Sequence, residues 1–345
     1  MSTETFDFVI PLYRIRWNTR AVLEGISFHY QPRAIHVIAP ATEAQVLTNI
    51  AQEWQTAPLF AHEEETFFQT VGLTKNRICA ELDLGESLYT PGWFYQQLLK
   101  LGAFVGIEDL SEWYMVWDSD LLPVDTWQII TEETNQVKHS FALLQHNGWG
   151  NPTIVSKWEQ WINSVLEVKA VTDEEGTFIP HHMWFKQEHL KSFAKQVNKY
   201  YNSSDHWLQL MMRSANEFGT FSEYWAYVSW VASHAAEDLS YYPYSQYGKT
   251  TERFFDDGTG LFSATVEKTL SDKSGDRSFP YTVVNSFINS VYKSEELPSS
   301  LSFESSPRHL KKKEENMHIE ELRSRWNPRE EIATVNPEKP VSQIS

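Results

Sequence analysis

Apolar and polar positions change their spacing several times along the first 120 residues of the chain. Short apolar runs cover residues 6–13, 34–39 and 113–117, whereas residues 18–27 and 42–54 are read as helical stretches. Short apolar runs are typical of buried strands, and a spacing of three to four residues is typical of helices. The pattern predicts strand, helix, strand and helix within the first sixty residues. Such an order favours an α/β domain with a mainly parallel sheet.

A further helix is predicted to begin after Thr90 and to end at Gly102. Thr90 can cap the helix, Pro91 suits its first position, and glycine commonly follows the last turn. Helical stretches are also predicted at residues 158–168, 186–200, 207–215 and 224–236. The predicted fold is therefore a mixed, mainly parallel sheet flanked by helices, with a more helical C-terminal half.

The apolar periodicity ends near residue 294. Serine pairs, prolines and a mixed-charge run at residues 311–315 replace it. Segments that bury little apolar surface do not offset the entropy of ordering. Residues 291–345 are therefore predicted to form a charged, largely disordered tail.

The overall charge bears on which kinds of partner the protein can bind. The 345 residues carry a formal net charge of -17, which argues against a nucleic-acid partner because such proteins normally present a basic face. A nucleotide ligand is still compatible, since a metal ion and a few local cations can neutralise a diphosphate. The 14 Trp, 15 Tyr and 20 Phe suit either a Trp-rich core or the flat binding of sugar rings.

The cysteine content and the lack of signal-peptide and transmembrane patterns predict the cellular compartment. Cys79 is the single cysteine, so the chain cannot form an internal disulfide, which fits a reducing compartment. The first seven residues do not have the pattern of a signal peptide. No transmembrane segment is predicted, because no stretch approaches the roughly 18 apolar residues that a span needs. These features predict a cytoplasmic protein.

Asp118 and Asp120 stand directly after the apolar run at residues 113–117. Ligands of open α/β sheets bind beyond the carboxyl ends of the strands. Two carboxylates separated by one residue can face one divalent cation, and Mg²⁺ and Mn²⁺ prefer oxygen ligands. The pair is consequently a candidate metal site, and an ordinary strand-ending turn is the alternative.

Gln97 and Lys100 are three residues apart in the predicted helix after Thr90, so they share one helical face. A lysine there could reach a phosphate oxygen as a point charge. The alternative is a solvated polar face on an amphipathic helix.

His181 and His182 lie in the segment from Phe178 to Phe185, which is predicted to be a loop-to-helix junction. A neutral imidazole can accept a proton, orient a hydroxyl or bind a metal. If the segment is extended, adjacent side chains point to opposite faces, so at most one would enter a site. The alternative is one packed and one exposed histidine.

Glu223 follows Ser222, which can cap a helix that is rich in aromatic residues. The helix dipole favours an anion in the first turn, and a carboxylate held there could accept the proton of an acceptor hydroxyl. Helix capping alone is the alternative.

Taken in order, these motifs resemble those of a family of glycosyltransferase-like proteins. The chain shows a Val-Ile-Pro-Leu strand, Gly-Trp-x-x-Gln-Gln-Leu-Leu-Lys-Leu, a strand ending in Asp-Ser-Asp, Pro-His-His-Met and Ser-Glu-Tyr. That family is similar in turn to the GT-A nucleotide-sugar transferases. The resemblance covers roughly residues 6 to 240.

The resemblance implies a metal-dependent glycosyltransferase that uses Mn²⁺ or Mg²⁺ and a nucleotide-sugar donor, with a glycan or other hydroxyl acceptor. It implies one domain over residues 1–290, with a nucleotide-sugar-binding half at 1–125 and an acceptor half at 126–290. The implied site residues are Asp118 and Asp120 for the metal, Arg77, Gln97, Lys100 and Asp118 for the donor, and His181, His182 and Glu223 for catalysis on the acceptor side.

The resemblance leaves the third metal ligand open, with His206 and His234 as possible candidates. Two other functions are compatible with the same residues. One is a nucleotidyltransferase on the same sheet. The other is a non-catalytic module that binds a carbohydrate or a protein partner.

Overall fold

The structure is a computed structural model that describes eleven stretches of the chain. These are residues 5–82, 90–126, 130–131, 136–137, 139–142, 152–172, 178, 180–242, 251–254, 278–292 and 297–303.

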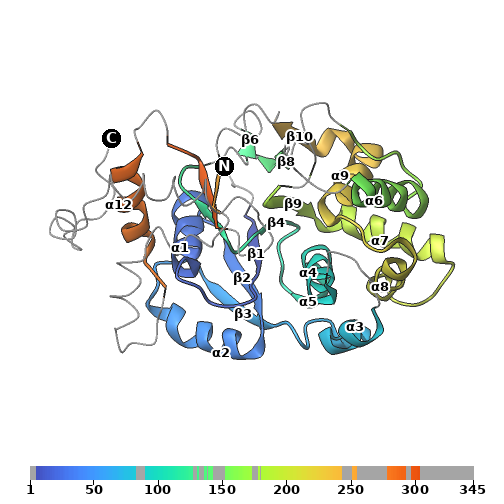
Figure 1. Cartoon of the computed structure of the whole chain (residues 1–345), viewed down its shortest axis with the longest axis horizontal. Helices are drawn as coiled ribbons and strands as arrows, with labels where there is room; N and C mark the ends of the chain where they lie inside the picture. The colour runs from blue at the N-terminus through green and yellow to red at the C-terminus, as the bar shows by residue number, and fades with distance from the viewer. Residues whose placement is uncertain are drawn as a thin grey trace.

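Helices and strands alternate in the N-terminal part, and helices dominate from residue 152 onward (Figure 1). The α-helices are α1 (Thr19–Tyr30), α2 (Ala41–Ile50), α3 (Lys75–Glu81), α4 (Pro91–Leu101), α5 (Ala103–Gly106), α6 (Pro152–Val165), α7 (Gln187–Tyr201), α8 (Trp207–Phe218), α9 (Glu223–His234) and α12 (Tyr281–Val291). The strands are β1 (Asp7–Pro11), β2 (Ala34–Ala39), β3 (Leu59–Glu63), β4 (Trp113–Trp117), β5 (Leu121–Pro123), β6 (Ile130–Thr131), β7 (Gln136–Val137), β8 (His139–Ala142), β9 (His182–Lys186), β10 (Leu239–Tyr242), β11 (Thr251–Phe254) and β12 (Ser300–Phe303).

The central sheet has the strand order β3-β2-β1-β4-β9. The first four of these strands are parallel, and β9 is antiparallel to β4, with Trp117 opposite His182. The chain moves outward from β1 to β3 and then crosses to the other side of β1 to form β4. The carboxyl ends of β1 and β4 therefore flank the topological switch point, which is where open α/β sheets bind ligands.

Side chains of the central strands alternate between two cores, one on each face of the sheet. Phe8 and Ile10 of β1 pack in the core with α1, α2 and α12, which we call the α1 face. Val9 packs in the other core with α4, α8 and α9, which we call the α4 face. Figure 1 shows the two groups of helices on opposite sides of the sheet. The predicted fold class, a mixed and mainly parallel sheet flanked by helices, is confirmed.

Helix α4 begins and ends where the sequence predicts. The Thr90 hydroxyl accepts a hydrogen bond from the Trp93 amide at 3.2 Å, and Pro91 occupies the first turn. At Gly102, which follows the helix, a Cβ atom would lie 2.8 Å from the Phe68 ring. Glycine is therefore needed there for close packing as well as for ending the helix.

Two predictions about extended segments need correction. Residues 182–186 form the edge strand β9, whereas a loop-to-helix junction was predicted; helix α7 starts only at Gln187. Strand β12 lies inside the predicted disordered tail, and it pairs with β5 and β11. Leu301 and Phe303 are fully buried in the α1-face core, which explains why this short segment is ordered. Residues 304–345 of the predicted tail lie outside the described residues.

The two predicted halves of the domain share one sheet. Strand β9 comes from the second half and pairs with β4 of the first, and α12 contacts α1. The boundary at residues 125 and 126 stays a prediction. Within the described stretches, no helix combines the length and the apolar character that crossing a membrane requires.

Candidate functional site

The candidate site lies at the carboxyl end of β4, where a tight turn presents two aspartates. The Asp118 amide donates to the His181 carbonyl at 2.9 Å, and the Leu121 amide donates to the Asp118 carbonyl at 3.0 Å. The Asp120 carbonyl accepts a hydrogen bond from the Phe303 amide at 2.9 Å. Strands β9 and β12 therefore fix the backbone on either side of the acidic pair.

Asp118, Asp120 and His181 come together as one possible ligand group. Each offers one ligand atom, and these atoms all lie within 4.8 Å of one another. The Nδ1 atom of His181 is 3.5 Å from Oδ2 of Asp118. Two carboxylates and an imidazole suit a divalent cation, since carboxylates favour Mg²⁺ and Mn²⁺ and imidazole suits transition metals.

Lys100 lies at the centre of a buried charge cluster. Its Nζ atom is 2.9 Å from Oδ1 of Asp118 and 3.0 Å from Oε1 of Glu223. The same atom lies 4.5 Å from the centre of the Tyr224 ring. Contacts of this kind between an ammonium group and an aromatic face are attractive. The cluster joins α4, β4 and α9, which are far apart in the sequence.

The polar face of α4 is buried. Gln97 is 2% exposed and Lys100 is 5% exposed, so the alternative of a solvated face is wrong. The Nε2 atom of Gln97 donates to the Trp93 carbonyl at 3.2 Å. Its Oε1 atom is buried and accepts no hydrogen bond from the part of the protein that the structure describes. A buried acceptor without a donor is costly, which makes this atom a candidate contact for a ligand.

Burial and charge act in opposite directions on the two carboxylates beside Lys100. Burial raises the pKa of Asp118, but the charge of Lys100 and the contact with His181 outweigh it and bring the pKa to about 2. Burial also raises the pKa of Glu223, and there Lys100 offsets the effect only in part. Burial lowers the pKa of Lys100, but Asp118 and Glu223 together raise it well above its usual value. Lys100 is therefore charged at neutral pH.

His182 is the first residue of β9 and His181 directly precedes it, and their side chains contact different residues. The ring of His182 packs on the Trp117 ring with centroids 5.0 Å apart, on the α1 face. Burial is the main cause that lowers the pKa of His182 to about 3, and the nearby His181 adds to it. The His182 ring is therefore neutral at physiological pH. The structure brings His181 to the acidic pair and keeps His182 in the core.

Glu223 begins α9, as predicted. Ser222 is the N-cap, and its hydroxyl accepts a hydrogen bond from the Trp225 amide at 3.4 Å. Glu223 itself is 3% exposed and bonded to Lys100. Its carboxylate therefore does more than stabilise the first turn of the helix.

The other predicted site residues lie elsewhere. Arg77 lies on the surface of α3, where its Nε atom donates to Oε1 of Glu81 at 2.9 Å and its Nη1 atom donates to the Gly72 carbonyl at 2.7 Å. Its role as a donor contact stays a prediction. His206 is the N-cap of α8, and His234 stacks on Trp230 with ring centroids 3.8 Å apart. Neither histidine belongs to the ligand group of Asp118 and Asp120.

Sequence reasoning missed residues near the same edge of the sheet. Tyr224 covers Lys100, and its place beside Glu223 could have indicated this. Tyr13 follows the first strand and is 77% exposed. Lys75 pairs with the Glu64 carboxylate, and its Nζ atom lies 5.9 Å from the centre of the Tyr13 ring. The sequence pattern placed Tyr13 within the apolar run at residues 6–13, whereas β1 ends at Pro11, so the exposure of this tyrosine was not predicted.

The family of the chain follows from a match over most of its length. Residues 18–290 match the Family of unknown function (DUF6492). The chain belongs to this family. No curated protein matches this member of the family.

Solved structures that match include glycosyltransferases. Mouse xyloside xylosyltransferase 1 in its apo form has 8% identity and a TM-score of 0.41, over 76% of this chain and 92% of that chain. Core-mannan synthase A from Aspergillus fumigatus, in an Mn/GDP form, has 11% identity and a TM-score of 0.43, over 69% and 73%. The apo glycosyltransferase GlyE of Streptococcus pneumoniae has 11% identity and a TM-score of 0.36, over 93% and 63%. At such low similarity, the chemistry has to be inferred from this chain's own residues.

Proposed function

We propose that this chain is a metal-dependent glycosyltransferase of the GT-A type. It would move a sugar from a nucleoside-diphosphate donor to a hydroxyl acceptor, such as a glycan. The observation that carries this proposal is the group of Asp118, Asp120 and His181 at the switch point of the sheet, beside the buried Lys100.

The charges of the site support a divalent cation. The ammonium group of Lys100 contacts two carboxylates, those of Asp118 and Glu223, and Asp120 brings a third carboxylate to Asp118. Gathering carboxylates in a partly buried place is unfavourable unless positive charge offsets them. A divalent cation such as Mn²⁺ or Mg²⁺ would add that positive charge. Asp118, Asp120 and His181 would hold the ion.

A cation bound by these residues would supply charge stabilisation for the diphosphate leaving group. Lys100 holds Oδ1 of Asp118, which leaves Oδ2 on the side of His181 and the cation site. The buried Oε1 atom of Gln97, one turn earlier in α4, can accept a hydrogen bond from a donor hydroxyl. These residues would bind and orient the donor, and the transfer would depend on how closely the donor and the acceptor are held together.

Glu223 has two possible roles in this proposal. As a general base, it would have to meet the acceptor hydroxyl at hydrogen-bonding distance. Glu223 is 3% exposed, and its carboxylate already accepts a hydrogen bond from Lys100 at 3.0 Å. We therefore assign it a positioning role, in which it holds Lys100 against Asp118. His182 is buried on the other face, so only His181 remains at the site.

The direct test is a turnover assay with a panel of nucleotide sugars, in the presence of Mn²⁺ and then of a chelator. The proposal predicts release of the nucleoside diphosphate from one donor, loss of this activity with the chelator and its recovery when Mn²⁺ is restored. Release of pyrophosphate would instead identify a nucleotidyltransferase. Turnover indistinguishable from buffer for every donor, with and without hydroxyl acceptors, would contradict the proposal and favour a binding module.

A further inference from the structure

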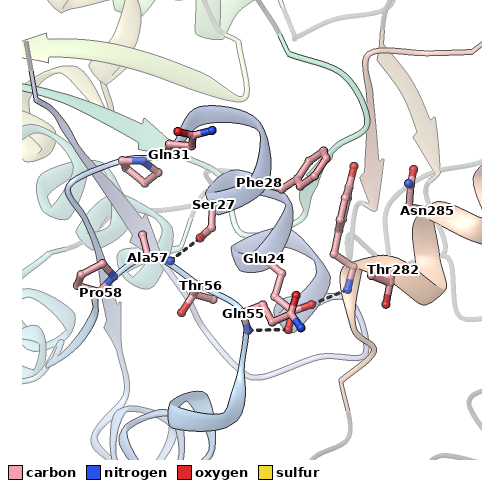
Figure 2. Close-up of a pocket in the computed structure, with 12 residues that line it drawn as sticks. Glu24, Ser27, Phe28, Gln31, Gln55, Thr56, Ala57, Pro58, Thr282 and Asn285 are labelled. Atoms are coloured by element: carbon pink, nitrogen blue, oxygen red, sulfur yellow. Dashed lines mark hydrogen bonds between the residues drawn. The ribbon is translucent and has the colours of Figure 1, made fainter. Parts of the chain in front are cut away.

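A pocket on the α1 face lies on the opposite side of the sheet from the Asp118 site. Its floor is the outer side of α1, where Glu24, Ser27 and Phe28 are spaced three and four residues apart. One wall is the segment at residues 55–58, and the other is the start of α12 (Figure 2). The volume is about 470 Å³, which is within the range of small-molecule sites.

Hydrogen bonds to the backbone tie both walls to the floor. Oε1 of Glu24 accepts from the Gln55 amide at 3.1 Å, and Oε2 accepts from the Tyr281 amide at 2.8 Å. The Ser27 hydroxyl accepts from the Ala57 amide at 2.8 Å. Figure 2 shows these contacts as bridges across the base of the pocket. The pocket is therefore built into the fold, and a ligand would not have to order it.

The lining is neutral toward a ligand. Among the described lining residues, Glu24 is the only acidic or basic side chain, and it is 5% exposed and engaged by Arg20 and the two amides. The remaining polar groups are amides and hydroxyls, including those of Gln31, Gln55 and Asn285. A phosphate or sulfate group would find no cation here, whereas amide and hydroxyl groups can both donate to and accept from neutral hydroxyls.

Phe28 adds an aromatic surface at the mouth of this pocket. It is 52% exposed, and its ring lies 5.8 Å from the Tyr281 ring at an interplanar angle of 34°. Figure 2 shows the Phe28 side chain directed toward the α12 wall. An exposed aromatic ring beside several amides presents one apolar face and a polar rim, which matches the two faces of a pyranose ring.

We infer that this pocket binds a neutral saccharide, with one sugar ring on Phe28 and its hydroxyls on the amides of Gln31, Gln55 and Asn285. The inference stands independently of the proposed transferase activity, because none of these residues belongs to the Asp118 cluster. A saccharide held here would leave the carboxyl edge of the sheet open.

The experiment measures binding of four neutral disaccharides, maltose, cellobiose, lactose and mannobiose, by saturation-transfer NMR and titration. We expect at least one to bind the wild-type chain with a dissociation constant on the order of 1 mM. Phe28→Ala should weaken that binding by about tenfold or more, because stacking on the ring is lost. Asn285→Ala should weaken it as well.

Two controls separate the pocket from other effects. Phe60→Ala removes a ring that is similarly exposed, at 51%, but lies outside the pocket, so it should leave binding unchanged. Asp120→Asn should also leave binding unchanged, which distinguishes this pocket from the Asp118 site. The inference is overturned if none of the four disaccharides binds the wild-type chain, or if Phe28→Ala and Phe60→Ala behave alike. If a proline-rich peptide binds the pocket and none of the disaccharides does, the inference is likewise overturned and the pocket is assigned to a protein partner.

Discussion

Two carboxylates, the buried Glu24 on the α1 face and the partly buried Asp118 at the end of β4, have different surroundings. The Glu24 carboxylate pairs with the Arg20 guanidinium at 2.7 Å and also accepts hydrogen bonds from the backbone amides of Gln55 and Tyr281. Asp118 shares Lys100 with Glu223 and lies beside a further carboxylate, that of Asp120. Glu24 thus has a cation of its own, whereas Asp118 shares its cation with a second carboxylate.

The comparison separates two uses of a buried charge. A buried carboxylate that receives all its donors from the chain contributes to the fold, because its desolvation cost is offset within the protein. A group of neighbouring carboxylates can instead be stabilised by a bound ligand that brings positive charge. The four predictions below test this difference, starting with the largest expected effect.

Asp120→Asn should lower turnover by about 10³-fold or more, because one of the two carboxylates for the cation is lost. The melting temperature should change little, since Asp120 is partly exposed and the backbone bond from Phe303 remains. Asp125→Asn is the matched control, because this aspartate is exposed and lies just after β5, whereas Asp120 lies just before it. Nucleoside-diphosphate release and thermal unfolding are measured for both. Retention of most of the activity in Asp120→Asn would remove the metal assignment.

Ending the chain at residue 296 should destabilise the protein and weaken the site together. This change removes β12, including the fully buried Leu301 and Phe303, at a cost of about 3 kcal/mol or more. It also removes the Phe303 amide that holds the Asp120 carbonyl. A chain that ends at residue 306 keeps β12 and is the control. Equal unfolding free energies in urea for the two chains would show that β12 does not stabilise the fold.

Glu24→Gln should have the opposite profile to Asp120→Asn. The new amide group would face a backbone donor in place of an acceptor, which costs about 1–3 kcal/mol of unfolding free energy. Turnover per folded molecule should not change, because Glu24 lies on the face away from Asp118. Chemical denaturation measures the unfolding free energy, and kinetics normalised to the amount of folded protein measure the turnover. A loss of turnover without a loss of stability would abolish the distinction between the carboxylates.

Glu223→Gln should lower kcat by only about tenfold, since glutamine can still accept a hydrogen bond from Lys100. Loss of a general base would instead lower kcat by roughly 10²- to 10⁴-fold and remove one limb of the pH profile. Glu188→Gln is the control, because Glu188 also occupies the first turn of a helix but is exposed. The pH dependence of kcat in the three proteins decides whether Glu223 positions Lys100 or accepts a proton.

Local patterns predicted much of the fold and part of the site. The apolar runs at β1, β2 and β4, the caps of α4 and the acidic pair after β4 depend on neighbouring residues in the sequence, so they could be read from it. A loop-to-helix junction was predicted at His181 and His182, and the two side chains were expected to point apart only if the segment were extended, as it proves to be.

Contacts between distant segments could not be predicted in the same way. Lys100 and Glu223 are separated by 123 positions, and only the packing of α4 against α9 brings them together. Strand β12 alternates serine with apolar residues, and Ser300 and Ser302 are fully buried, which composition alone does not indicate. The family resemblance implied an acceptor-side role for His181, and its place beside Asp118 follows from the pairing of β9 with β4, which local patterns did not predict.

Titration with Mn²⁺ alone, followed by electron paramagnetic resonance, tests the central claim most directly. The wild-type chain should bind one ion, and His181→Gln should weaken this binding by at least about tenfold, as expected for loss of a ligand. His182→Gln is the matched control, because the neighbouring ring packs on Trp117 away from the acidic pair, and it should leave the affinity of the folded protein unchanged. Equal affinities in wild type and His181→Gln, or an equal loss in both variants, would contradict a cation held by Asp118, Asp120 and His181.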